Sequence, residues 1–128
     1  MGTVSLTDTP HPLLPGGHNY LKYQWTDGAR SVWFSAARKG NGMTMHICAP
    51  NRTDKLALRV AGEDFVNYLF DTFDWLEVIF CISNIQATIN QSIKQNFHFL
   101  GKITAETEQG TTENFVVTAR YRDKRVVH

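Results

Sequence analysis

Two residues that could move a proton lie in apolar runs that predict strands. His46 lies in the run 43–49, where a neutral imidazole could serve as a general base. Glu77 lies in the run 75–83 and is the second candidate base. His46 has a structural alternative, a hydrogen-bonded histidine within a sheet. The residue types therefore indicate acid–base chemistry at two positions, and the elements around them must decide whether these positions meet.

The thiols and the remaining histidines indicate no further chemistry. Cys48 and Cys81 lie far apart in apolar runs without basic neighbours, so we expect buried thiols rather than nucleophiles. There is no CxxC pair, and two cysteines are too few for a disulfide framework, which favours a reduced, intracellular compartment such as the cytoplasm. The other histidines lack the spacing of metal ligands, so no metal site is predicted: His11, His18, His98 and His128.

Aromatic and basic clusters offer weaker possibilities. Four strand aromatics could stack a nucleobase, although aromatics in strands usually pack in the core: Tyr20, Tyr23, Trp25 and Trp33. The basic cluster near the end could contact phosphate, but we expect a solvated tail: Arg120, Arg122, Lys124 and Arg125.

Length and charge limit the function classes. The 128 residues fit one domain, and 42% hydrophobic residues can form a core. The formal net charge of +1 gives no electrostatic footprint for nucleic acid or an anionic membrane. No apolar run reaches the roughly 20 residues of a membrane helix, and residues 1–8 do not resemble a signal peptide.

The first half of the chain predicts an antiparallel meander and a helix. Residues 1–19 contain three prolines and predict an irregular arm. Strands are predicted over 20–26, 31–38 and 43–49, joined by turns at Asp27-Gly28 and at Gly40-Asn41-Gly42. An apolar stripe then predicts an amphipathic helix: Leu58, Ala61, Phe65, Leu69 and Phe73. Asn51 or Thr53 could cap this helix.

The second half predicts a buried strand, a helix and a hairpin. The continuous apolar run 75–83 is typical of a central strand covered on both faces. A second helix is predicted from the stripe Ile85, Ile89, Ile93, Phe97 and Leu100, with Gly101 as its C′ residue. Residues 102–108 and 114–121 predict a hairpin around Gly110.

These elements predict an α+β fold in the order β-β-β-α-β-α-β-β. The helix between the third and fourth strands makes a right-handed parallel crossover, so a central parallel pair has antiparallel flanks. The expected domain covers 20–122, preceded by the arm 1–19 and followed by a basic tail, 123–128.

That order resembles the GCN5-related N-acetyltransferase (GNAT) fold over about residues 20–121. In that family a loop of pattern Arg/Gln-x-x-Gly-x-Gly/Ala before the main helix binds the pyrophosphate of acetyl-CoA. The matching stretch is Arg52, Thr53, Asp54, Lys55, Leu56 and Ala57. Arg52 and Ala57 fit the pattern, whereas Lys55 replaces a glycine and Asp54 adds negative charge.

The family's second motif is an Asn, a Tyr and a Leu-Gly-Phe across the next helix. Asn90 and Leu100-Gly101 match it, and Phe97 occupies the position of the Tyr that protonates the leaving thiolate. Because phenylalanine has no proton to donate, the resemblance implies a site without its general acid. The cofactor-binding candidates are thus residues 52–57 and Asn90, with His46 or Glu77 as base.

The run 90–103 also resembles accessory virion proteins of short-tailed bacteriophages. That likeness implies a head-assembly or DNA-ejection protein built on a degenerate N-acyltransferase fold, with other virion proteins as partners. No cofactor is then expected, and acetyl-CoA should bind weakly or not at all. The alternative is an active N-acetyltransferase that uses acetyl-CoA and an unidentified amine.

Overall fold

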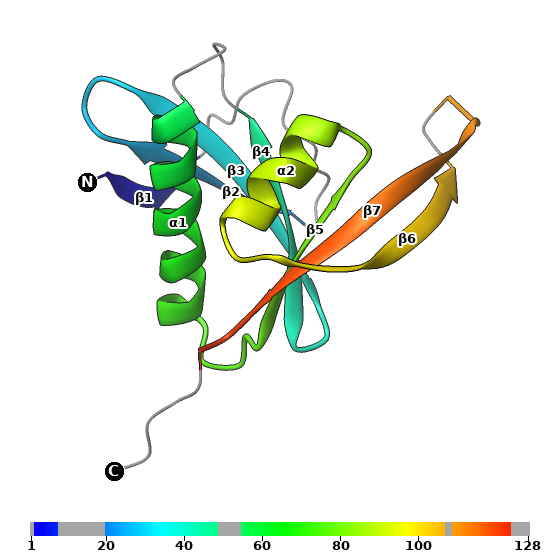
Figure 1. Ribbon diagram of the computed structural model, residues 1–128. Helices are drawn as coiled ribbons and strands as arrows, with labels where there is room; N and C mark the ends of the chain where they lie inside the picture. The colour runs from blue at the N-terminus through cyan, green and yellow to red at the C-terminus, as the bar shows by residue number, and fades with distance from the viewer. Residues whose placement is uncertain (1, 8–19, 49–54, 107–108, 124–128) are drawn as a thin grey trace.

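In the part of the chain that it describes, the computed structural model forms a seven-stranded mixed sheet with two helices (Figure 1). The structure describes residues 2–7, 20–48, 55–106 and 109–123. The strand order is β1-β2-β3-β4-β5-β7-β6. The elements are β1 (Thr3–Leu6), β2 (Leu21–Thr26), β3 (Ser31–Lys39), β4 (Gly42–Cys48), α1 (Lys55–Thr72), β5 (Val78–Ser83), α2 (Gln86–Lys94), β6 (His98–Glu106) and β7 (Thr112–Tyr121).

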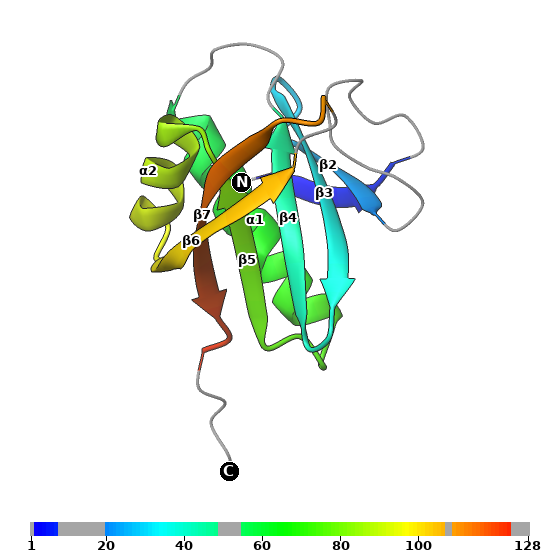
Figure 2. The same ribbon diagram turned by 90° about the vertical axis from the view of Figure 1, so that its right-hand side faces the viewer.

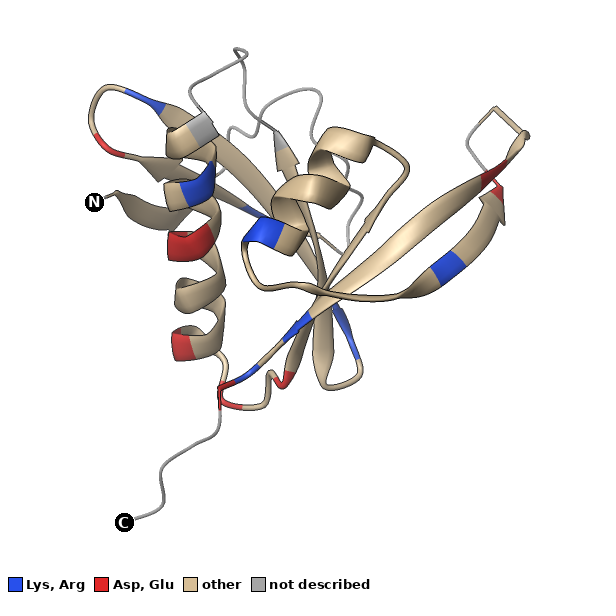
Figure 3. Cartoon of the chain, viewed as in Figure 1, with Lys and Arg blue, Asp and Glu red and all other residues tan. Residues whose placement is uncertain are grey.

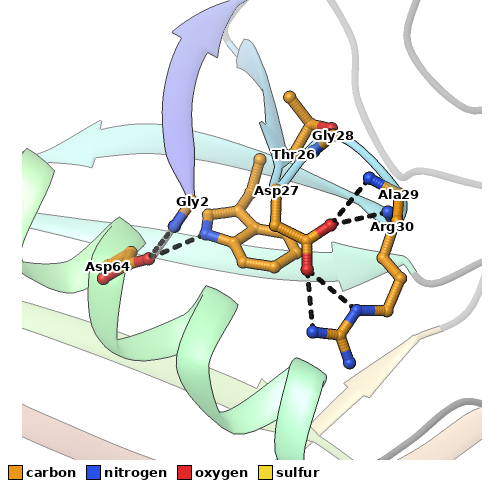
Figure 4. A network of polar contacts seen from close by, with 8 residues as sticks. Gly2, Thr26, Asp27, Gly28, Ala29, Arg30 and Asp64 are labelled. Atoms are coloured by element: carbon orange, nitrogen blue, oxygen red, sulfur yellow. Dashed lines mark hydrogen bonds and ion pairs between the residues drawn. The ribbon is translucent and has the colours of Figure 1, made fainter.

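The predicted α+β architecture is confirmed. β4 and β5 are parallel, and every other neighbouring pair in the sheet is antiparallel. The turns of the meander also form as expected. Asp27 accepts hydrogen bonds from the backbone N–H of Arg30 and of Ala29, at 2.7 and 3.0 Å, and these bonds with the Arg30 side chain lower the pKa of Asp27 to about 2 (Figure 4).

The arm is not irregular throughout, because β1 adds a strand that the sequence did not predict. Thr3–Leu6 precede the prolines, so their backbone N–H groups can pair with β2. Asp64 of α1 accepts a hydrogen bond from the Trp25 indole at 2.8 Å and one from the Gly2 backbone at 3.3 Å (Figure 4). These contacts tie the start of β1 to α1.

Both helices cover the same face of the sheet. Arg120 and Thr118 lie two residues apart in β7 and therefore on one face. Arg120 pairs with Glu63 of α1, and Thr118 with Ser92 of α2. The main core lies under α1, where the rings of Phe34 and Phe65 stack 4.2 Å apart. Figure 2 shows α1 behind the sheet, with β5 and β4 in front of it.

The second helix is shorter than predicted. It ends at Lys94, and His98–Glu106 form β6, so Leu100 and Gly101 lie in a strand and Gly101 is not a C′ residue. Asn96 takes the left-handed conformation that follows the helix, with φ 67°. The helical spacing of apolar residues extends past the end of α2 into β6, whose Phe99 and Leu100 are exposed.

The basic end is also more ordered than a solvated tail. Arg120 lies in β7, and Arg122 donates hydrogen bonds to the backbone oxygens of Leu76, Phe70 and Phe73. Lys124 and Arg125 lie outside the described residues. Neither helix is long and apolar enough to cross a membrane, as far as the described residues extend.

Candidate functional site

The parallel strands β4 and β5 separate before they end. Their pairing runs from Gly42–Val78 to Met45–Cys81 and stops there. Beyond this point β4 continues its pairing with β3 as far as Cys48, and β5 its pairing with β7 as far as Ser83. The facing backbone edges of 46–48 and 82–83 therefore do not pair with each other, and the sheet opens between them (Figure 1).

His46 is the first residue of β4 beyond the last paired rung. Its side chain is half-buried, and its ring lies 5.6 Å from that of Tyr20, at an interplanar angle of 49°. Burial lowers the pKa of His46 below its ordinary value of 6.5, so the imidazole is neutral at pH 7. A neutral imidazole where the strands separate can accept a proton from a bound amine.

Glu77 lies at the other end of the parallel pair. Its backbone N–H donates to the carbonyl of Asn41 at 2.8 Å, next to the first rung. His46 is five residues further along the register, about 16 Å away at about 3.3 Å per residue. The structure does not bring the two candidate bases together, and only His46 lies where the strands diverge.

The predicted cofactor loop is only partly described. Arg52, Thr53 and Asp54, together with the proposed cap Asn51, lie outside the described residues. Lys55 is the first residue of α1, Leu56 is exposed and Ala57 is buried. Since α1 follows β4, the backbone N–H groups of its first turn lie at the end of the sheet where β4 and β5 separate.

Asn90 lies on an exposed side of α2. Its side-chain oxygen accepts a hydrogen bond from the Gln86 amide at 2.8 Å, a contact within one helix. No contact in the described part of the chain connects Asn90 with His46 or with the first turn of α1.

The early end of α2 also changes the place of the family's second motif. In the family's motif the Gly-Phe pair follows the helix directly. In this chain that position is taken by Asn96, which has a left-handed backbone, and by the buried Phe97. Phe97 is therefore a core residue after the helix, not the residue at the general-acid position. Counting four residues back from Asn96 gives Ser92, whose hydroxyl donates to the Ile89 carbonyl and accepts from Thr118.

The other candidates are structural or lie elsewhere. Tyr23 and Trp25 are core residues, each 1% exposed, whereas Tyr20 and Trp33 are half-buried. Cys81 is half-buried in β5, and burial raises its thiol pKa. Of Cys48 the structure describes only the strand. No group of His, Cys, Asp or Glu among the described residues could hold a metal ion.

Two shallow hollows lie around the end of β7, away from the opening. One, of about 450 Å³, is lined by Asn96, His98, Arg120, Tyr121, Arg122 and Asp123, and the second, of about 150 Å³, adjoins it. The guanidinium groups of Arg120 and Arg122 already bind Glu63 and backbone carbonyls, so they are committed to structural contacts.

Solved acetyltransferase structures share this fold. The Escherichia coli ribosomal-protein-S18-alanine N-acetyltransferase matches with a TM-score of 0.65 and 15% identity, over 93% of this chain and 92% of that one. A ribosomal L7/L12 α-N-protein acetyltransferase in complex with coenzyme A matches with a TM-score of 0.68 and 12% identity, over 82% of this chain and 63% of that one. An aminoglycoside acetyltransferase in complex with coenzyme A gives a TM-score of 0.65 at 14% identity, over 81% and 67%. No family model and no curated protein matches the sequence.

The structural class is therefore a GNAT-like fold. The chain spans almost all of the first of these enzymes and less than two thirds of the second. At these identities the likeness concerns the fold, and chemistry has to be argued from the residues at the opening.

Proposed function

We propose that this domain binds a coenzyme A thioester where β4 and β5 separate and transfers its acyl group to an amine. The observation that carries the proposal is the end of the parallel pairing at Met45–Cys81. The backbone groups of 46–48 and 82–83, which do not pair with each other across the opening, can hydrogen-bond the amides of an extended pantetheine arm. The N–H groups at the start of α1 suit the pyrophosphate.

A bound acyl-CoA would supply a thioester. In the transfer, a C–N bond forms between the acyl carbon and the amine and the C–S bond of the thioester breaks. The amine loses a proton, and the leaving thiolate gains one. His46, neutral at pH 7, can accept the amine's proton. Lys55 has a Cβ where the family's loop has glycine, so we expect weaker binding than such a loop gives. The names of structural neighbours that act on protein alanine or α-amino groups make a polypeptide α-amine the first acceptor to test.

The proposal is tested by calorimetry with acetyl-CoA, followed by an acyl-transfer assay. Saturable binding is expected, and at 100 times the dissociation constant the ligand should stabilise the fold by about 2.7 kcal/mol. His46→Gln should lower transfer about 10²- to 10⁴-fold and leave binding in place. Glu77→Gln is the matched control and should change neither quantity. Absence of binding at millimolar acetyl-CoA would overturn the proposal.

An assembly role in a virion is the second candidate, and the edge strand β6 favours it. Phe99, Leu100 and Ile103 expose apolar side chains along this strand, and exposed edge strands can pair with another chain. Figure 3 shows few charged residues on α2, the helix before this strand. Sedimentation of the unmodified chain and of Phe99→Lys, without ligand, tests it: self-association that the substitution abolishes supports assembly, and monomers in both oppose it.

A further inference from the structure

The side-chain amide nitrogen of Gln91, in α2, is a buried donor. No hydrogen-bond partner for Gln91 Nε2 exists within the described part of the chain. Leaving a buried N–H unpaired is unfavourable, so such groups call for a physical explanation. An apolar side chain of similar shape would remove the penalty.

Neighbouring contacts place Gln91 at the opening between the parallel strands. The next residue, Ser92, accepts a hydrogen bond from Thr118 at 3.0 Å, and Thr118 is paired with Cys81. Cys81 belongs to the last rung of the parallel pair. Gln91 therefore lies at the level where β4 and β5 separate.

A second contact fixes the side of α2 on which Gln91 lies. Gln95, one turn later on the same side, donates from Nε2 to the backbone carbonyl of Arg59 in α1 at 2.6 Å. Gly62 permits this approach, since a Cβ there would lie 2.5 Å from the Gln95 amide. One turn back along α2 leads toward the end of the sheet where α1 begins (Figure 1). Gln91 is therefore on the side of α2 that faces α1, at the level where the strands separate.

We propose that Gln91 donates a hydrogen bond to a carbonyl oxygen of the bound pantetheine–thioester arm. The inference rests on the proposed function and adds a recognition residue to the same site. The amide offers two N–H donors and suits a carbonyl acceptor, and it has no proton to transfer at pH 7. Its role is to position the arm, while proton transfer belongs to other groups.

The experiment compares Gln91→Met with Gln86→Met, a matched change on the exposed side of the same helix. Melting temperature without ligand and calorimetry with acetyl-CoA are measured for both variants. Gln91→Met should melt a few degrees higher than the unmodified chain, because an unpaired buried donor is removed. It should also bind acetyl-CoA at least tenfold more weakly, a change of about 1.4 kcal/mol. Gln86→Met should bind as the unmodified chain does.

The outcomes separate this inference from the proposed function. If the unmodified chain binds acetyl-CoA and Gln91→Met binds it equally well, the inference is wrong and the proposed function stands. A lower melting temperature for Gln91→Met would show that the amide supports the fold, which also overturns the inference. If the unmodified chain does not bind acetyl-CoA, both are wrong.

Discussion

Arg122 should contribute more to stability than any solvated tail residue could. Its Nε donates to the Leu76 carbonyl at 2.7 Å, and one terminal nitrogen donates to the carbonyls of Phe70 and Phe73 at 2.9 and 2.6 Å. Phe70 lies in the last turn of α1, where backbone carbonyls lack partners within the helix. The guanidinium also lies 5.1 Å from the centre of the Phe70 ring. One side chain thus closes the connection from α1 to β5.

The expected cost of Arg122→Ala follows from these contacts. Hydrogen bonds to a charged donor contribute about 1.5–3 kcal/mol each. Because the site is part-buried and water can reach some of the freed carbonyls, we expect a total loss of about 3 kcal/mol. Stabilities of about 0.05–0.15 kcal/mol per residue make this a large fraction of the whole. The melting temperature should fall by about 10 °C.

Urea unfolding and thermal melting of the unmodified chain, Arg122→Ala and Arg122→Lys check this prediction. Arg122→Ala should lower the urea midpoint without changing the slope. Arg122→Lys keeps the charge but has one ammonium in place of the fork, so it should recover only part of the loss. A fall below about 2 °C for Arg122→Ala would show that the three contacts contribute little and that the tail interpretation was right.

Four further predictions concern single side chains. Glu63→Gln breaks a two-pronged ion pair with Arg120, and since Glu63 is half-exposed the free energy of unfolding should fall by about 0.5–1 kcal/mol. Because the pKa of Glu63 is lowered, this contribution is present above pH 4.5 and is lost on acidification. A urea midpoint that changes equally with pH in the unmodified chain and in Glu63→Gln would refute this prediction. His46 resists protonation when folded, so stability should fall as pH drops below 6.5 toward its lowered pKa, and His46→Gln should flatten that part of the profile. Cys81 should react slowly with a thiol reagent in a Cys48→Ser background and rapidly in denaturant, and fast native labelling would contradict its burial. Thr44→Val removes a buried hydroxyl that has no partner in the described residues and should stabilise by about 1 kcal/mol in urea unfolding, whereas destabilisation would indicate a missed acceptor.

Periodicity predicted the elements better than their ends. The stripe from Leu58 to Phe73 and the apolar run before Ser83 are long, so a helix and a central strand follow from spacing alone. The end of α2 could not be found this way, because Phe97 and Leu100 continue the helical spacing into an edge strand. Asn96 ends the helix in a conformation that usually calls for glycine, and this signal is weaker in a sequence.

The site was less predictable because its geometry depends on register. His46 lies in β4 and Glu77 directly before β5, and nothing in their spacing shows that Gly42 pairs with Val78. A one-residue slip in register would turn the side chains of a whole strand to the other face of the sheet. The same limit applies to the basic end of the chain. A cluster of arginines and lysines has the same composition whether it is solvated or, like Arg122, hydrogen-bonded to three backbone carbonyls.

The two ends of the parallel pair differ in a way that bears on function. Just before the first rung, Glu77 N–H donates to the Asn41 carbonyl, and the Glu77 carbonyl accepts from the N–H of Arg122. Backbone hydrogen bonding at this end therefore extends one residue beyond the start of β4 and of β5, which satisfies backbone groups there. At the far end the strands stop pairing after Met45–Cys81, and the Gln91 amide nitrogen in α2 has no acceptor among the residues that the structure describes. Under the proposed function, a ligand in the opening would hydrogen-bond the backbone groups that do not pair across it.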